Sequence, residues 1–127
     1  MFNFKIALLN MLFKFNVVSD LPGRLRLKVN NYKKIPKEAQ LYQNYAIEAV
    51  KKIEGINNVQ FNFVIGTILI EYDVNKISSK EVVDWINQIK NLIAKNIDYI
   101  NSISDEPEEK IKEKLFILLD EYIKNKR

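Results

Sequence analysis

Residues 53–73 read IEGINNVQFNFVIGTILIEYD, and this stretch decides the fold. Apolar side chains recur in it at every second position, a period that predicts two half-buried strands. The alternating positions are Val59, Phe61, Phe63, Ile65, Ile68, Ile70 and Tyr72. Gly66 supplies the turn between the strands, most simply a two-residue hairpin with glycine at positive φ. Gly55 is placed to end a preceding helix as its left-handed cap.

A third strand precedes this stretch in the sequence. After a turn at Pro22-Gly23, apolar and basic residues alternate over residues 24–29, which predicts one buried face and one cationic face. Pro36 then opens a helix, where its missing N–H costs nothing. The buried stripe of this helix is predicted to contain Tyr42, Tyr45, Ala46, Ala49 and Ile53.

A second helix begins with a clear signal. Ser78 is the N-cap residue and Glu81 lies three positions later, which is the spacing of a capping box. The sequence leaves the end of this helix open. It either runs to about Asn101, or it stops near Lys95 and is followed by a short fourth strand around residues 97–103.

Two apolar segments flank this arrangement, so we divide the chain into residues 1–15, 16–103 and 104–127. Residues 2–15 fit an amphipathic helix with a wide apolar face, interrupted by too many polar residues to span a membrane. The last segment predicts a helix whose apolar face must pack on something. The side chains expected to face the domain or a partner are Leu8, Leu12, Phe15, Ile111, Leu115, Leu118 and Tyr122.

The order strand, helix, strand, strand, helix is typical of an α+β, ferredoxin-like fold, with an antiparallel sheet and its helices on one face. The motifs PGRLRL at 22–27, EGINNV at 54–59 and GTILIEYD at 66–73 resemble the cysteine-free branch of heavy-metal-associated domains. The resemblance covers about residues 17–95. It implies a small bacterial protein, or a segment that precedes a P-type cation ATPase.

The composition excludes several kinds of chemistry. The chain contains no cysteine and no histidine, so disulfides, thiolate metal sites and histidine-dependent triads are excluded. Metal-carrying members of the family have two cysteines between the first strand and the first helix, where this chain reads NNYKKIP at 30–36. We therefore expect no metal ligand, no cofactor and no catalytic residue. The acidic residues at 105–109 are explained by a helix N-terminus.

The outward face of the sheet is the best candidate for a functional surface. It is predicted to carry Arg24, Arg26, Lys28, Val64, Leu69 and Glu71. We expect its arginines to pair with Glu71 or with carboxylates of a partner, and part of the face to be covered by a terminal helix or another copy. RNA binding is disfavoured, because the strand aromatics fall on the core side.

These observations favour a non-catalytic interaction module in the cytoplasm. It would form a homo-oligomer or dock on a protein partner such as a cation-transport ATPase. One alternative is a peripheral membrane protein anchored by residues 2–15. Another is a protein that binds or traffics metal through oxygen ligands.

Overall fold

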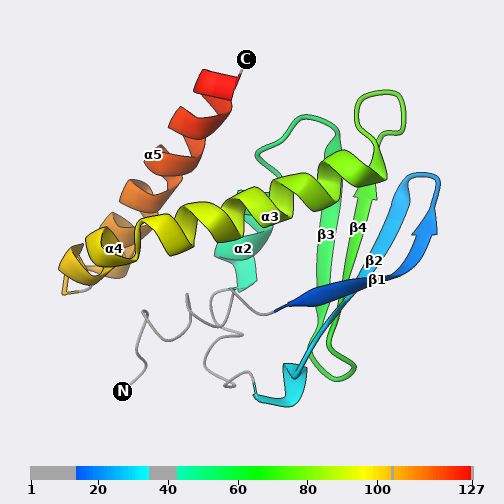
Figure 1. Ribbon diagram of the computed structural model, residues 1–127, viewed down its shortest axis with the longest axis horizontal. Helices are drawn as coiled ribbons and strands as arrows, with labels where there is room; N and C mark the ends of the chain where they lie inside the picture. The colour runs from blue at the N-terminus through cyan, green and yellow to red at the C-terminus, as the bar shows by residue number, and fades with distance from the viewer. Residues whose placement is uncertain (1–13, 35–42, 104, 127) are drawn as a thin grey trace.

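The computed structural model describes residues 14–34, 43–103 and 105–126, and it has the expected α+β architecture (Figure 1). A four-stranded antiparallel sheet is covered on one face by helices. The strands are β1 (Phe15–Leu21), β2 (Arg24–Val29), β3 (Ile56–Asn62) and β4 (Thr67–Tyr72). The helices are η1 (Tyr32–Lys34), α2 (Gln43–Val50), α3 (Ser79–Lys95), α4 (Ile97–Ile103) and α5 (Glu108–Lys126).

The sheet order is β1-β2-β4-β3, with every neighbouring pair antiparallel. The chain passes from β2 through α2 to β3 and leaves the central place for β4, as a ferredoxin-like fold requires. The fourth strand comes from β1, at the edge next to β2. Phe15 therefore begins a strand and packs against the core, and its assignment to an N-terminal helix was wrong. Residues 97–103 form α4, so the alternative of a fourth strand there is excluded.

Alternation along the strands places the core as predicted. Leu25, Leu27 and Ile70 are fully buried, and Val59 and Tyr72 are nearly so. The buried side chains of α3 pack against them, and these are Val82, Trp85, Ile89 and Ile93. Burial of this apolar layer is the main term that stabilises the fold.

The predicted start of α3 is confirmed, and of its two alternative ends the structure has the earlier one. The capping box is present, with the Glu81 N–H donating to Ser78 Oγ at 3.2 Å. The helix ends at Lys95, because the Asn96 side chain donates to the Leu92 carbonyl at 2.7 Å. A second short helix, α4, follows at once instead of a continuous helix to Asn101.

The end of α2 also differs from the prediction. The helix ends at Val50, and residues 51–55 form turns, so Gly55 is not its cap. The Trp85 indole N–H instead donates to the carbonyls of Val50, at 3.0 Å, and Ala49, at 3.3 Å. The last carbonyls of a helix lack partners within the helix, and the Ala49 carbonyl also accepts from the Lys52 N–H at 3.3 Å. The predicted helix start at Pro36 and the side chain of Tyr42 lie outside the described residues.

The β3–β4 hairpin has a four-residue loop, residues 63–66, and not the two-residue turn predicted. Its last strand pair is Asn62 with Thr67. The Asn62 side-chain oxygen accepts hydrogen bonds from the N–H groups of Val64, at 3.1 Å, and Ile65, at 3.3 Å. This local bonding ends β3 at Asn62, three residues before the predicted end, so Phe63 and Ile65 do not extend the strand. Gly66 has a φ of 71°, as a glycine at positive φ was expected to have.

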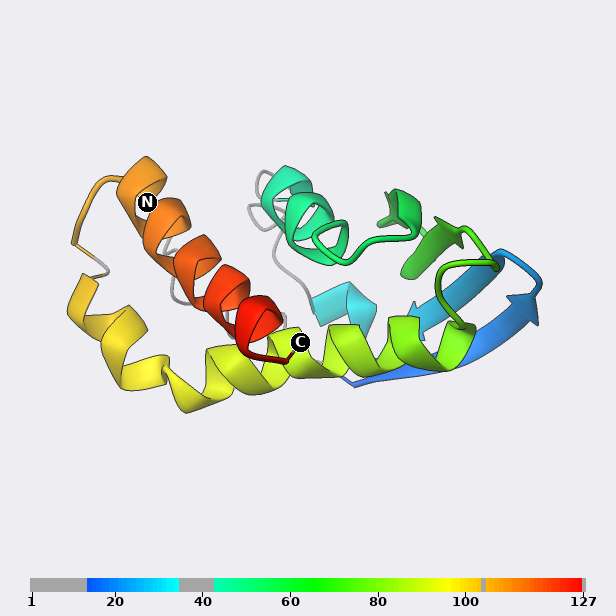
Figure 2. The same cartoon turned by 90° about the horizontal axis from the view of Figure 1, so that it is seen from above.

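The apolar face of α5 packs on its own chain. Ile111 and Leu119 are buried, and α5 contacts both α2 and α3 (Figure 2). Leu115 and Tyr122 pack against the core, Leu119 is buried, and Leu118 is half-buried. The Tyr122 ring stacks on Trp85 with centroids 6.2 Å apart. The predicted face at Leu8 and Leu12 lies outside the described residues.

Candidate interaction surfaces

The outward face of the sheet brings together most of the predicted surface residues. In the register of β2 and β4, Arg24 lies opposite Glu71, Arg26 opposite Leu69 and Lys28 opposite Thr67. The outer strands extend this face with polar side chains on both sides. By register, these are Asn58, Gln60 and Asn62 on β3 and Asn16 and Ser19 on β1. We call this surface the outer sheet face.

Val64 does not belong to the outer sheet face. It lies in the hairpin loop beyond the end of β3, and it is 84 % exposed. The prediction that Val64 and Leu69 mark one covered area was therefore wrong for Val64. Among the described helices, α5 packs on the opposite side of the sheet, with the core, and does not cover this face.

The charges of the outer sheet face are arranged differently from the prediction. Glu71 accepts a hydrogen bond from the Asn58 side chain at 3.0 Å, across β3 and β4. Within the described parts of the chain, Arg24 and Arg26 form no ion pair. Lys28 lies over the Tyr32 ring, with its Nζ 5.1 Å from the centroid. The face thus presents two arginines without an ion pair among the described residues: Arg24 faces Glu71 in register, and Arg26 lies between Ser19 and Leu69.

The contribution of β1 was missed by sequence reasoning. A β-bulge between Val17 and Ser19 interrupts its period of two, so the usual strand signal is lost. The adjacent valines Val17 and Val18, followed by the Pro22-Gly23 turn, are the signal that could have revealed it. Asp20 accepts a hydrogen bond from the Ser79 hydroxyl at 3.0 Å, which ties β1 to the start of α3.

The segment between β2 and α2 does not fit a heavy-metal ion. Its described residues are a turn at Asn30 and Asn31 followed by η1, and they offer amide, phenol and ammonium groups. Soft metal ions require thiolate or imidazole ligands, and a lysine repels any cation. Across the parts of the chain that the structure describes, no group of three or more acidic side chains is placed to hold a metal.

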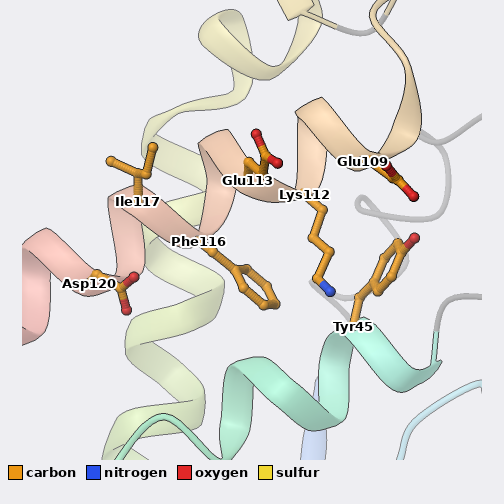
Figure 3. A pocket seen from close by; sticks show the side chains of 7 residues that line it. All are labelled: Tyr45, Glu109, Lys112, Glu113, Phe116, Ile117 and Asp120. Atoms are coloured by element: carbon orange, nitrogen blue, oxygen red, sulfur yellow. The ribbon is translucent and has the colours of Figure 1, made fainter.

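A shallow groove runs between α2 and α5 (Figure 3). Lys112 and Phe116 point from α5 toward α2, and Tyr45 points from α2 toward α5. Lys112 forms an ion pair with Glu48 at 3.1 Å, and its Nζ lies 4.9 Å from the centroid of the Tyr45 ring. These contacts join two helices of one chain, so the groove is explained by the attachment of α5.

A second ion pair supports the same attachment. Lys52, in the turn after α2, contacts Asp120 of α5 at 2.6 Å and lies over the Phe116 ring at 4.7 Å. The carboxylates of both pairs are about half exposed or more, so each pair contributes little to stability by itself. Together they fix the orientation of α5 on the domain.

Comparison with protein families agrees with this fold. The family model described as heavy metal associated domain 2 matches residues 2–126. The chain belongs to the heavy metal associated domain 2 family. The match includes both terminal segments, although the motifs in the sequence carry the resemblance only over about residues 17–95. No curated protein and no solved structure matches the chain. Within the described residues, no helix has the length and apolar character needed to cross a membrane.

Proposed function

We propose that this heavy-metal-associated domain is a non-catalytic interaction module that docks on an acidic protein surface without carrying a metal ion. The observation that supports the proposal is the outer sheet face. Arg24 and Arg26 lie side by side on it and form no ion pair among the described residues, with Arg24 opposite Glu71 and Arg26 opposite Leu69 in register. A cationic surface of this kind favours a partner with complementary charge.

The chemistry of the chain supports contact rather than catalysis. Without cysteine or histidine, nucleophilic and acid–base groups are limited to carboxylates, lysines, tyrosines and hydroxyls. Apart from Glu71, the uncharged polar side chains around the arginines are amides and hydroxyls, which suit the rim of a protein interface. The partner is either a second copy of the chain or a cation-transport ATPase, which the family resemblance suggests.

Charge reversal on the outer sheet face tests the proposal. The double variant Arg24→Glu/Arg26→Glu changes two side chains that form no ion pair among the described residues. Because Arg24→Glu places a carboxylate opposite Glu71, urea unfolding of the variant is measured alongside to verify that it is folded. Lys110→Glu/Lys124→Glu is the matched control, because both lysines are exposed on α5, away from the sheet. Multi-angle light scattering over a range of concentrations measures self-association. Affinity capture of a cation-transport ATPase from the same organism measures the other partner.

The expected result is a complex in one of the two assays that the control variant keeps. The arginine variant should weaken it by about tenfold or more, because a charge pair in an interface contributes on the order of 1.5 kcal/mol or above. Association that the arginine variant and the control affect equally would contradict the role of this face. A monomer that also fails to capture the ATPase would contradict the proposed function itself.

A further inference from the structure

The β3–β4 hairpin loop carries the most exposed large apolar side chain of the described residues. Val64 is 84 % exposed, and the neighbouring Ile65 is 44 % exposed. The Asn62 side chain holds the backbone of both residues, so the conformation of the loop does not depend on either aliphatic side chain. Adjacent exposed aliphatic residues at a loop end indicate a contact surface.

Cationic side chains surround this loop. Tyr32 of η1 packs its ring directly against Gly66, the last residue of the loop. Lys28 lies over the same ring, and the exposed Lys33 follows Tyr32 in η1. Figure 1 shows η1 and the β3–β4 loop together at the lower end of the sheet. The two aliphatic residues and these two lysines therefore lie at one end of the molecule.

The chain enters the sheet at this same end. Phe15 pairs with Val29, and the Asn30 N–H donates to the Lys14 carbonyl at 2.8 Å. Residues 2–13 are attached through Lys14, and nine of these twelve residues are apolar in the sequence. Whatever path they follow, their point of attachment lies beside the hairpin loop.

Negative charge is absent from the segments that build this end. No aspartate or glutamate occurs in residues 14–19, 27–34 or 60–68. A basic residue of α3 also lies here, since Lys90 is placed over the Phe15 ring with its Nζ 4.8 Å from the centroid. Burial, and to a lesser extent the charge of Lys14, lower the pKa of Lys90.

We propose that this end, which we call the hairpin tip (residues 63–66 with Lys14, Lys28 and Lys33), docks on an anionic lipid surface. Val64 and Ile65 would enter the boundary between headgroups and acyl chains, and the lysines would contact the anionic headgroups. A lipid surface accepts a projecting loop without a matching pocket. A protein interface needs shape complementarity, which a loop of two aliphatic side chains among lysines supports less well.

Co-sedimentation of the full chain with vesicles tests this inference. One set of vesicles contains phosphatidylserine and phosphatidylcholine in equal parts, and the other contains phosphatidylcholine alone. The wild-type chain is expected to bind the anionic vesicles more tightly, and added salt should weaken this binding. Val64→Asp/Ile65→Asp should lower the partition coefficient by about tenfold or more, because two apolar contacts are replaced by charges that the lipid repels.

Matched controls separate the hairpin tip from general surface effects. Val74→Asp makes the same change at a valine that is 56 % exposed beside Gly23, at the opposite end of the sheet, and should leave binding nearly unchanged. Lys28→Gln should weaken binding by about fivefold, whereas Arg24→Gln, at the far end of the same strand, should weaken it less. Val64→Trp should strengthen binding, since tryptophan favours the interface.

Two results would overturn the proposal. One is a wild-type chain that does not sediment with the anionic vesicles. The other is a Val64→Asp/Ile65→Asp variant that binds as the wild type does. Unchanged binding of Val64→Asp/Ile65→Asp would contradict the hairpin tip even if deletion of residues 1–13 abolished binding. The N-terminal segment would then bind the vesicles without the hairpin loop. Arg24→Glu/Arg26→Glu should impair protein docking and leave the response to Val64→Asp/Ile65→Asp intact, so the two proposals can fail independently.

Discussion

Gly66 links the turn chemistry of the hairpin to the packing of η1. Its φ of 71° lies in the left-handed region, where an L side chain is strained. A Cβ at this position would overlap the Tyr32 ring, which packs flat against the glycine. Gly66 thus adopts the positive φ of the turn and also leaves room for the Tyr32 ring. The sequence revealed only the turn, because the position of Tyr32 depends on the path of η1.

Gly66→Ala is expected to destabilise the fold by about 3 kcal/mol, of which roughly 1–2 kcal/mol arises from backbone strain. Gly23→Ala is the matched control. It has a similar φ of 76°, but its added Cβ would meet the Tyr72 carbonyl at 3.1 Å and no ring. We expect Gly23→Ala to lower the free energy of unfolding by about half as much as Gly66→Ala. Urea unfolding followed by the fluorescence of the single tryptophan, Trp85, measures both.

A double-mutant cycle isolates the contribution of the ring. In a Tyr32→Ala background, Gly66→Ala should lose the part of its cost that arises from steric overlap and become similar to Gly23→Ala. An equal cost of Gly66→Ala in both backgrounds would show that the Tyr32 ring does not rest on this glycine.

The elements show which sequence signals were sufficient. Strict alternation of basic and apolar residues in β2 predicted its buried face correctly, and in β4 the buried residues Ile70 and Tyr72 also lie on the predicted face although Leu69 interrupts the alternation. Alternation fails in β1 because of the bulge after Val17, and the apolar residues before Phe15 made this region resemble a helix. The charge pairs could not be predicted either, because the side chain that donates to Glu71 is Asn58, which comes from a third strand.

The packing of α5 gives a test at the level of one helix. Leu119→Ala should cost about 2–4 kcal/mol, because Leu119 is 6 % exposed within the core and its truncation leaves a cavity. Ile117→Ala, two residues away and 53 % exposed, should change the free energy of unfolding by about 0.5 kcal/mol or less. Urea denaturation of the two variants measures the difference. Equal effects would show that α5 does not pack in this orientation.

For the whole molecule, the fold could be predicted further than the function. The order of elements and three motifs were enough for the family, which the match over residues 2–126 shows. The place of the fourth strand and the intramolecular packing of α5 were not predictable, because both depend on contacts between segments far apart in the sequence. The hairpin tip could not be predicted for the same reason, since Lys14, Lys28 and Val64 lie at one end of the sheet only in the folded chain.

The central claim is that a heavy-metal-associated fold is used here for contact alone. Cysteine and histidine are missing from the entire sequence, and the described residues contain no alternative cluster of carboxylates. Isothermal titration calorimetry of the intact chain with copper(I), zinc(II) and manganese(II) tests this directly. We predict only heats of dilution for each ion. Stoichiometric, saturable binding of any of the three would contradict the claim.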